Sequence, residues 1–331
     1  MKKTFLHVRR LGATALAFAG ALPAGAAPAA AKSPSGSPAP ASPSPAAAAP
    51  DAATLREPKK LADGVWGMMT KGGANAGWFT LGDAVVAVDA GRSAEDAEAI
   101  VAAIGTTTGN KPISHLVLTN DFGPHAGGAA VFAKHGAAIV AHENLLPGIQ
   151  ALVGAASPKP GASPAPLVGI ATRILLAAPG RHVVIRHFGP ADSAGDLVVF
   201  LVEDKILFSG DLAEAYLLPP LFSKTIDPEG WLSALTVLGN LNSRAVVPGY
   251  GPMGPPQAVA ATREYLEHAL NVAQTLVKGN VPEDFYATRI AEPDLKIAGL
   301  PAELQKSHEA NVKALVAWVK KKGATNAPSG K

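Results

Sequence analysis

Short apolar runs separated by polar residues and glycine-containing turns dominate the first half of the chain. Runs of this length predict β-strands, whereas apolar positions at helical spacing predict helices. The expected strands span residues 64–69, 77–81, 84–88, 115–118 and 139–141. The expected helices span residues 93–104, 126–135 and 143–153. Ser93 is a favourable N-cap for the first of these helices, and Glu95 follows in its first turn.

The second half of the chain changes from strands to long helices. Strands are expected over residues 182–186, 197–202, 205–208 and 245–247, and helices over residues 228–238, 256–278 and 301–322. The last two helices carry apolar stripes that we expect to pack in a core: Tyr265, Ala269, Val272 and Leu276, and Val312, Leu315, Val316 and Val319. Two groups of strands, each interleaved with helices, predict a layered α/β domain with sheets inside and helices outside.

Both ends of the chain lack this patterning. Residues 1–26 combine a basic start, a short apolar run and a final Ala-Gly-Ala, which is the pattern of a cleaved signal peptide. Residues 27–54 are almost entirely Ala, Pro and Ser, a composition typical of a disordered linker. The folded domain is expected over residues 55–322, with a disordered tail over residues 323–331. The mature protein is therefore expected in the periplasm or outside the cell.

Removal of the leader changes the charge of the protein. The full chain has 29 Lys and Arg against 26 Asp and Glu, a formal net charge of +3. Four of the basic residues and no acidic residue lie in residues 1–26, so the mature chain has 25 − 26 = −1. This balance predicts no nucleic-acid partner and no membrane association after signal cleavage. The chain has no cysteine, which excludes disulfides, thiolate metal ligands and a lipoprotein anchor.

Four segments carry the candidate chemistry. They are residues 116–128 (LVLTNDFGPHAGG), 189–196 (GPADSAGD), 206–212 (ILFSGDL) and 246–252 (VVPGYGP). In order and spacing they resemble the metallo-β-lactamase superfamily, whose patterns are T-H-x-H-x-D-H-x-G-G, G-P-x-H-T-x-G-D, L-F-x-G-D and V-P-G-H-G-P. Asn75 and Asp89-Ala90-Gly91 match the early segment of that family. The resemblance covers about residues 60–275 and implies an α/β fold, the αββα four-layer sandwich.

In that family the strand-end loops present seven ligands to two zinc ions, and a hydroxide between the ions is the nucleophile. Of these seven ligands, only His125 and Asp211 are retained here. The other five positions are substituted: Asn120, Phe122, Asp192 and Tyr250 replace histidines, and Pro124 replaces an aspartate. Phe122 and Pro124 have no side-chain lone pair to offer a metal. The resemblance thus implies hydrolase ancestry, but the sequence does not support a dinuclear zinc site.

Three interpretations of this degenerate site remain open. The first, which we favour, is a weakly active or non-catalytic protein that has a binding or scaffold role and no cofactor. The second is a hydrolase with a single divalent ion such as Mn, Mg or Ca, for which the candidate ligands are His125, Asp211, Asp192 and Asn120. The third is a metal-free hydrolase of an ester, thioester or amide, with Asp192 and Asp211 as acid and base and His125 as proton shuttle.

Two uses of the cleft stay open: it binds a small-molecule ligand, or it serves only as scaffold. Its expected lining residues are Asn120, Asp121, Phe122, Pro124, Tyr250 and His187. His182 and His187 lie five residues apart on an expected strand, so they would point to opposite faces and would not share a ligand. His268 and His308 lie on the last helices and are expected at the surface. The sequence identifies neither the ligand, nor a protein partner, nor the oligomeric state.

Overall fold

The computed structural model describes residues 57–154, 165–215, 225–297 and 302–326. The expected signal peptide and the linker up to residue 54 lie outside the described residues. The last helix runs to Asn326, so it extends past the domain boundary expected at residue 322. None of the described helices is long and apolar enough to cross a membrane.

The first sheet has seven strands in sequential order. They are β1 (Lys59–Ala62), β2 (Val65–Met69), β3 (Asn75–Leu81), β4 (Ala84–Val88), β5 (Ile113–Val117), β6 (Ala138–His142) and β7 (Leu167–Ile170). Strands β1 to β4 pair antiparallel, and β4 to β7 pair parallel. The parallel half places the ends of β4 and β5 at the same edge of the sheet, which is where the first candidate residues follow.

The second sheet has five strands in the order β12-β11-β10-β9-β8. They are β8 (Arg173–Ala178), β9 (Arg181–Arg186), β10 (Val198–Leu201), β11 (Ile206–Gly210) and β12 (Ala245–Pro248). Strands β8 to β11 are antiparallel, whereas β11 and β12 are parallel. Because β11 and β12 run in the same direction, the loops after them also meet at one edge of the sheet.

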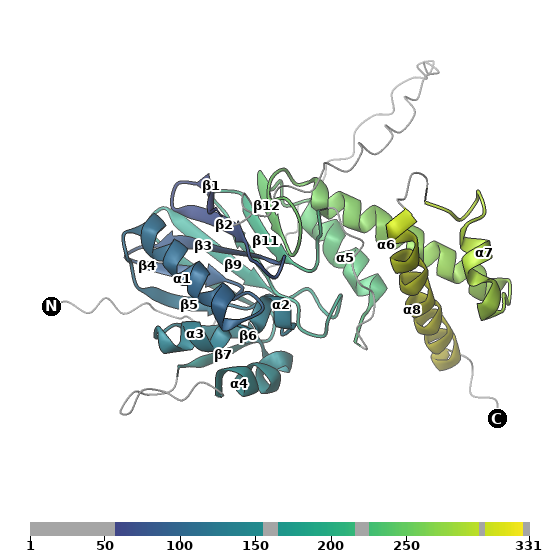
Figure 1. The fold of residues 1–331 in the computed structure, drawn as a ribbon, viewed down its shortest axis with the longest axis horizontal. Coiled ribbons are helices and arrows are strands. Elements are labelled where there is room, and N and C mark those ends of the chain that lie inside the picture. The colour runs from purple at the N-terminus through teal and green to yellow at the C-terminus, as the bar shows by residue number, and fades with distance from the viewer. Residues whose placement is uncertain (1–56, 155–164, 216–224, 298–301, 327–331) are drawn as a thin grey trace, which may run out of the picture. The chain divides into compact units, whose positions relative to one another are not determined.

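Helices cover the outer face of each sheet (Figure 1). The first sheet carries α1 (Ala94–Thr108), α2 (Gly123–Ala126), α3 (Ala129–Lys134), the 3-10 turn η2 (Glu143–Leu145) and α4 (Leu146–Gly154). The second sheet carries α5 (Pro228–Gly239) and α6 (Gln257–Lys278). Three further elements complete the C-terminal part: η3 (Glu283–Phe285), α7 (Tyr286–Ile290) and α8 (Ala302–Asn326).

Three apolar clusters show that the layers are helix, sheet, sheet, helix. One cluster lies between the two sheets, one lies under α1, α3 and α4, and one lies under α5, α6 and α8. The alternation along β3 illustrates the cause, since successive strand residues face opposite sides. Trp78 packs in the cluster under the helices, whereas Phe79 packs between the sheets, 6.2 Å from the ring of Phe208. The expected αββα sandwich is therefore confirmed.

The predicted elements are largely confirmed, with two kinds of error. Of the helix expected over residues 126–135, only Ala129–Lys134 forms a helix (α3), whereas Ala126 is the last residue of the separate short helix α2. Strands β1, β7 and β8 and the short helix α7 were not predicted. The stripes of the last two helices do pack in the core under the second sheet, as expected.

His308 in α8 is fully buried, so the expectation that it lies at the surface was wrong. It faces α6, where its ring lies 5.9 Å from the ring of His268 and its Nδ1 lies 3.3 Å from the Tyr265 hydroxyl. Burial, followed by the repulsion of His268, lowers the pKa of His308 to about 4. The buried imidazole is therefore neutral at neutral pH.

We expect His308 to make the folded state less stable as the pH falls from about 6.5 to about 4, by about 1–3 kcal/mol. In this range an unfolded histidine binds a proton and buried His308 does not, so protons favour the unfolded state. Urea unfolding at about pH 4.5 and at about pH 7.5 gives the free energy of unfolding at each pH, and the difference between the two values measures the effect. His308→Gln should reduce the pH dependence, whereas His135→Gln, at an exposed site, should not. Equal pH dependence in both variants would contradict this role.

Candidate functional site

The candidate residues follow the carboxyl ends of strands from both sheets. Asp89 follows β4, Asn120 lies just beyond β5, Asp211 follows β11, and Tyr250 lies just beyond β12. Asp89 has φ of 62°, a left-handed backbone conformation that is uncommon outside glycine, asparagine and aspartate. These residues are far apart in the sequence, but the strand ends that they follow bring them into a single cluster at one edge of the sandwich.

Hydrogen bonds hold the two sheets together at this edge. Asn75, at the start of β3, donates from its side-chain Nδ2 to the carbonyl oxygens of Pro248 and Gly251, at 2.8 Å each. Its backbone N–H donates to the Gly249 carbonyl at 2.8 Å. Asn75 therefore fixes the loop that carries Tyr250, which is a structural reason for its place in the early family segment.

His125 is fully buried between two carboxylates. Its Nδ1 lies 2.9 Å from Asp89 Oδ2, and its Nε2 lies 2.8 Å from Asp211 Oδ1. His125 Nε2 and Asp211 Oδ1 are close enough for an ion pair, but the N–H does not point at the oxygen well enough for a hydrogen bond. Burial opposes the charged ring, but the attraction of Asp211 and Asp89 outweighs it and raises the pKa of His125 well above its usual value. The ring is therefore an imidazolium at neutral pH.

The carboxylate of Asp89 is fixed on its other side by Thr119. The Thr119 backbone N–H donates to Asp89 Oδ1 at 2.8 Å, and its hydroxyl lies 3.0 Å from both carboxylate oxygens. Asp89 is thus a fully engaged partner of the His125 ring rather than a group open to a ligand.

Asn120 binds the second oxygen of Asp211. Its Nδ2 donates to Asp211 Oδ2 at 3.0 Å, and its Oδ1 accepts from the Phe122 backbone N–H at 3.0 Å. Asn120 is completely buried, so both ends of its amide are satisfied within the protein. The two oxygens of Asp211 therefore face Asn120 and His125.

Asp192 and Asp196 lie in the loop between β9 and β10, and both are buried. Burial, then the negative charges of Asp196, Asp211 and Glu214, raises the pKa of Asp192 well above its usual value. Asp196 accepts hydrogen bonds from the backbone N–H and the hydroxyl of Ser193 at 2.7 Å. Burial nevertheless raises the pKa of Asp196 to about 6. Two carboxyl groups of this loop therefore bind protons more readily than ordinary aspartates.

Tyr250 is half-buried and presents its ring edge to His125, with 5.5 Å between the ring centroids. Burial, followed by the charges of Asp211 and Glu214, raises the pKa of the Tyr250 phenol. The hydroxyl therefore keeps its proton at physiological pH. The exposed guanidinium of Arg92 acts in the opposite direction on this phenol.

Glu214 is a site residue that the sequence did not reveal. It lies three residues after Asp211 and is 3% exposed, and neither carboxylate oxygen has a hydrogen-bond partner among the described residues. The backbone N–H of the next residue, Ala215, donates to the Tyr250 carbonyl at 3.0 Å, which places the segment against the loop after β12. Burial and the nearby Asp211 raise the pKa of Glu214 well above its usual value. No motif in the sequence identifies Glu214, because its burial depends on the turn after Asp211 and on the contact of Ala215 with the loop after β12.

The other expected cleft residues are placed less centrally. Asp121 is half-buried, and its Oδ2 lies beside Gly148 of α4. Pro124 is half-buried within the short helix α2. His187 stacks on His142, with 3.9 Å between the ring centroids, and its Nδ1 lies 2.8 Å from the Asp196 carbonyl. His187 thus contacts the backbone of the Asp192 loop and does not share a partner with His182, which pairs with exposed Glu203.

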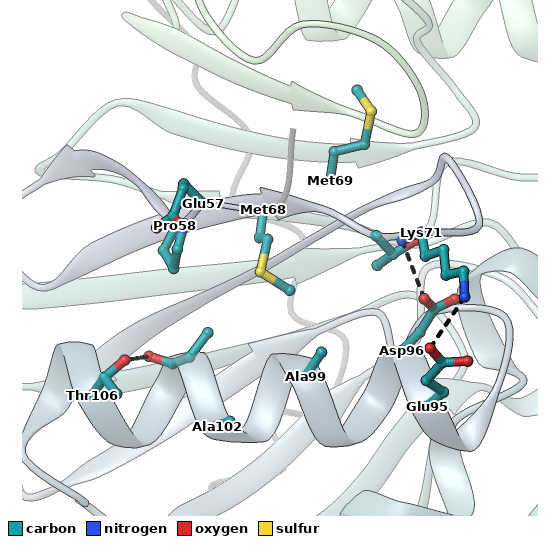
Figure 2. A pocket seen from close by; sticks show the side chains of 12 residues that line it. Glu57, Pro58, Met68, Met69, Lys71, Glu95, Asp96, Ala99, Ala102 and Thr106 are labelled. Atoms are coloured by element: carbon teal, nitrogen blue, oxygen red, sulfur yellow. Dashed lines mark hydrogen bonds and ion pairs between the residues drawn. The ribbon is translucent and has the colours of Figure 1, made fainter. Parts of the chain in front are cut away.

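A separate pocket of about 300 Å³ lies between β2 and α1 (Figure 2). Figure 2 shows the Met68 side chain pointing toward α1, and shows Lys71 bonded to Glu95 and Asp96 at the start of the helix. The nearest link to the strand-end cluster is Arg92, whose N–H donates to Asp96 Oδ2 at 3.1 Å. None of the candidate site residues lines this pocket.

The fold and the strand-end cluster define an αββα sandwich of the hydrolase-like type. A family model described as the metallo-beta-lactamase superfamily matches residues 69–250, which is more than half of the chain. The chain therefore belongs to the metallo-β-lactamase superfamily. A comparison with curated protein sequences found no match.

Solved structures support the fold. A metallo-beta-lactamase from Pontibacter korlensis is 24% identical, with a TM-score of 0.52, and the match covers 64% of this chain and 98% of that one. The FIM-1 metallo-beta-lactamase from Pseudomonas aeruginosa, in its mono-zinc form, is 22% identical with a TM-score of 0.52, covering 64% and 95%. The sec-alkylsulfatase Pisa1 from Pseudomonas sp. is 14% identical with a TM-score of 0.60, covering 83% and 52%. At these identities the likeness concerns the fold alone.

Proposed function

We propose that this chain is an exported member of the superfamily that does not carry out two-zinc hydrolysis and instead binds a small molecule in the cleft at the strand ends. The proposal of export rests on the leader pattern of residues 1–26. These residues precede the part of the chain that the family model matches, residues 69–250. A periplasmic or secreted location follows from that leader.

One observation carries the proposal: side chains at the family's ligand positions bind one another within the protein. Asp211 faces the Asn120 amide on one oxygen and the His125 ring on the other. Both ring nitrogens of His125 already face carboxylates, with Nδ1 at 2.9 Å from Asp89 and Nε2 at 2.8 Å from Asp211. The positive charge beside Asp211 is therefore supplied by His125.

The remaining positions do not fit two zinc ions either. Phe122 and Pro124 offer no side-chain donor, and the raised pKa of Tyr250 keeps its phenol neutral. Within residues 57–326, apart from the three undescribed gaps, no group of three or more His, Asp or Glu side chains is arranged to hold a metal ion. The side chains at these positions thus support a binding role better than they support zinc-dependent hydrolysis.

We expect the mature protein, purified and dialysed, to retain no stoichiometric zinc, and chelators to leave its unfolding temperature unchanged. Elemental analysis of the dialysed protein measures the first, and thermal unfolding with and without EDTA measures the second. A matched control restores the five substituted ligands: N120H, F122H, P124D, D192H and Y250H. That variant should retain zinc if it folds, which shows that the assay detects a metal site. Near-stoichiometric zinc in the natural chain would overturn the proposal.

A second candidate function is metal-free hydrolysis, and the state of Asp192 favours it. Burial raises the pKa of Asp192 well above its usual value and so favours the protonated carboxyl, which would act as a general acid opposite the Asp211 carboxylate. Chromogenic ester, thioester and amide substrates test this function in chelator. Turnover that is abolished in Asp192→Asn, while the unfolding temperature is kept, would replace the binding proposal. The same loss in Glu98→Gln, at an exposed site on α1, would instead indicate a nonspecific effect.

A further inference from the structure

We infer that the edge of the second sheet at β8 is a docking site for an extended segment of a protein partner that carries acidic side chains beside apolar ones. The site is the outer face of β8 and β9, formed by Arg173, Leu175 and Ala177 of β8 and by Val184 and Arg186 of β9, which we name the β8–β9 face. None of these residues belongs to the strand-end cluster, so the inference goes beyond the proposed function.

Strand β8 is the last strand of its sheet. Its six residues pair antiparallel with β9, and no described strand pairs with its other side. A strand in this position presents backbone N–H and C=O groups to which another chain can add as a further strand. Six residues are a usual length for a strand, about 5–6, so the edge is long enough to pair with one.

Leu175 points away from the core of the sandwich. Its neighbours Ile174 and Leu176 pack between the two sheets, so the alternation along the strand places Leu175 on the outer face, where it is 54% exposed. Val184 of β9 lies directly opposite Leu175, and Phe200 of β10 lies directly opposite Val184. An apolar row therefore crosses three strands, and its β8 end faces solvent.

The helices that cover the second sheet do not reach this end of the row. Val198 and Phe200 of β10 contact the apolar cluster under α5, α6 and α8, whereas no described residue of β8 or β9 belongs to that cluster or packs against it. A single exposed leucine is common on protein surfaces. A leucine that continues an apolar row beside a free strand edge is instead typical of a surface that binds another protein.

Two arginines on this face determine the charge of the partner. Arg173 and Arg186 lie directly opposite each other in the pairing of β8 with β9, and both are exposed. Like charges at such positions destabilise a sheet. Among the described residues, neither arginine forms an ion pair. The guanidinium of Arg186 lies 4.4 Å from the ring centre of Phe188, which fixes its position.

The three strands of this region supply no carboxylate to balance these arginines. Strands β8, β9 and β10 contain no Asp or Glu. Pairing of β8 with the β8 of a second copy would double the positive charge of the face without adding a carboxylate. Complementary charge is what selects one protein partner over another, so the geometry favours a different protein that supplies acidic side chains.

The spacing on β8 defines the pattern of the partner segment. Arg173 and Leu175 are two residues apart, so their side chains lie on one face of the strand. On an added strand, the residue beside Arg173 and the residue beside Leu175 are also two positions apart. The partner segment therefore carries an acidic and an apolar residue at alternate positions, with its backbone N–H groups free to pair.

Synthetic peptides test the inference on the whole mature protein. The probe is a blocked, labelled threonine peptide of about eight residues, with a central Glu and a Val two positions away on each side, so that either strand direction is accepted. One matched peptide has Lys in place of Glu, and another has the same side chains with N-methylated backbone amides. Fluorescence anisotropy should show that the Glu peptide binds about ten-fold more tightly than either matched peptide.

Variants assign this binding to the β8–β9 face. Arg173→Glu combined with Arg186→Glu should reverse the preference, so that the Lys peptide binds more tightly, a result that loss of folding does not produce. Leu175→Thr should weaken the binding of the Glu peptide while keeping a residue that favours strands. Lys134→Glu reverses a charge at an exposed position of α3 and should keep the natural preference.

Four outcomes would overturn the inference. Equal binding of the Glu and Lys peptides would show that the two arginines do not select the partner, and equal binding of the N-methylated peptide would show that no strand is added. Binding to phosphatidylglycerol vesicles in place of the peptides, lost in the double variant, would assign the face to a membrane. Self-association that is lost in Leu175→Thr would assign it to a second copy. None of these results depends on retained zinc, which tests the proposed function.

Discussion

Replacing His125 with alanine should lower the free energy of unfolding by about 3–5 kcal/mol. The variant leaves Asp89 and Asp211 buried without the imidazolium that lies 2.9 Å and 2.8 Å from them. Removing one partner of a buried ion pair costs more than the pair contributes, because the remaining charge stays desolvated. Urea unfolding of the variant and the natural chain near neutral pH measures the difference.

The pH dependence of this loss has a definite sign. The pKa of His125 is raised in the folded state, so the folded chain keeps its proton where an unfolded histidine has released it. The contribution of His125 to stability is therefore fully present below about pH 6.5 and declines as the pH rises through the folded-state pKa. The difference between variant and natural chain should thus shrink in alkaline buffer.

A matched control separates this effect from the loss of any histidine. His135→Ala removes an exposed imidazole at the end of α3 and should change stability by less than about 0.5 kcal/mol. His125→Gln keeps two polar ends without the charge and should give an intermediate loss. A cost below about 1 kcal/mol for His125→Ala would contradict the buried ion pair, given what such pairs normally cost.

Gly127→Ala should destabilise the protein by about 3 kcal/mol, at the upper end of what overpacking costs. A Cβ at this position would lie 2.0 Å from the carbonyl oxygen of Arg92, which belongs to the backbone and cannot rotate away. The neighbouring Gly128 is equally restricted, since its Cβ would lie 2.3 Å from the carbonyl oxygen of Ala90. Relief would require α2 and α3 to move away from the loop after β4.

The control for this substitution is the first residue of α2, the helix that Gly127 ends. Gly123 has open space at its Cβ position, so Gly123→Ala should be neutral within about 0.5 kcal/mol or slightly stabilising. Thermal and urea unfolding measure the stability of both variants. Gly123→Ala shows the effect of helix propensity alone, and the additional loss in Gly127→Ala shows the effect of the backbone contact. Similar stabilities for Gly127→Ala and Gly123→Ala would show that the chain relaxes at this point.

The Gly127 prediction also explains which parts of the family pattern this chain keeps. Gly127 and Gly128 are required by contacts between backbones, and His125 is required by its two carboxylates. Asn75 is required by its hydrogen bonds to the loop after β12. These residues would be retained for packing whether or not a metal is bound, whereas Phe122 and Pro124 stand where only a metal would require a donor.

The hydrophobic pattern was sufficient for most of the fold. The expected strand over residues 77–81 is present as β3, in which the adjacent residues Trp78 and Phe79 face opposite sides. The pattern did not identify β7 and β8, because their sequences, LVGI and RILLAA, have no two-residue alternation of apolar and polar positions. Strand β7 forms because β6 offers it a parallel partner, which is a contact that local sequence does not contain.

Only those site residues that belong to a family motif could be predicted from the sequence. The four collinear segments located Asn120, His125, Asp192, Asp211 and Tyr250, and the structure places all five at one edge of the sandwich. Glu214 follows no motif, and its importance depends on the turn after Asp211 and on the bond between Ala215 and Tyr250. His308 was assigned to the surface because a lone histidine on a helix gives no sign of which face is covered.

The sequence by itself determined most of the strands and helices in their order and the superfamily, and the resemblance to that superfamily implies that five of its seven metal-ligand positions are substituted. These features depend on local periodicity and on residue types in fixed order. Only the tertiary structure decided which groups replace the missing partners: His125 as the cation between Asp89 and Asp211, Asn120 as the second donor to Asp211, and Glu214 as an unpaired acid. The physical reason is that pairing and desolvation depend on distances between strand ends, which meet only when both sheets have packed.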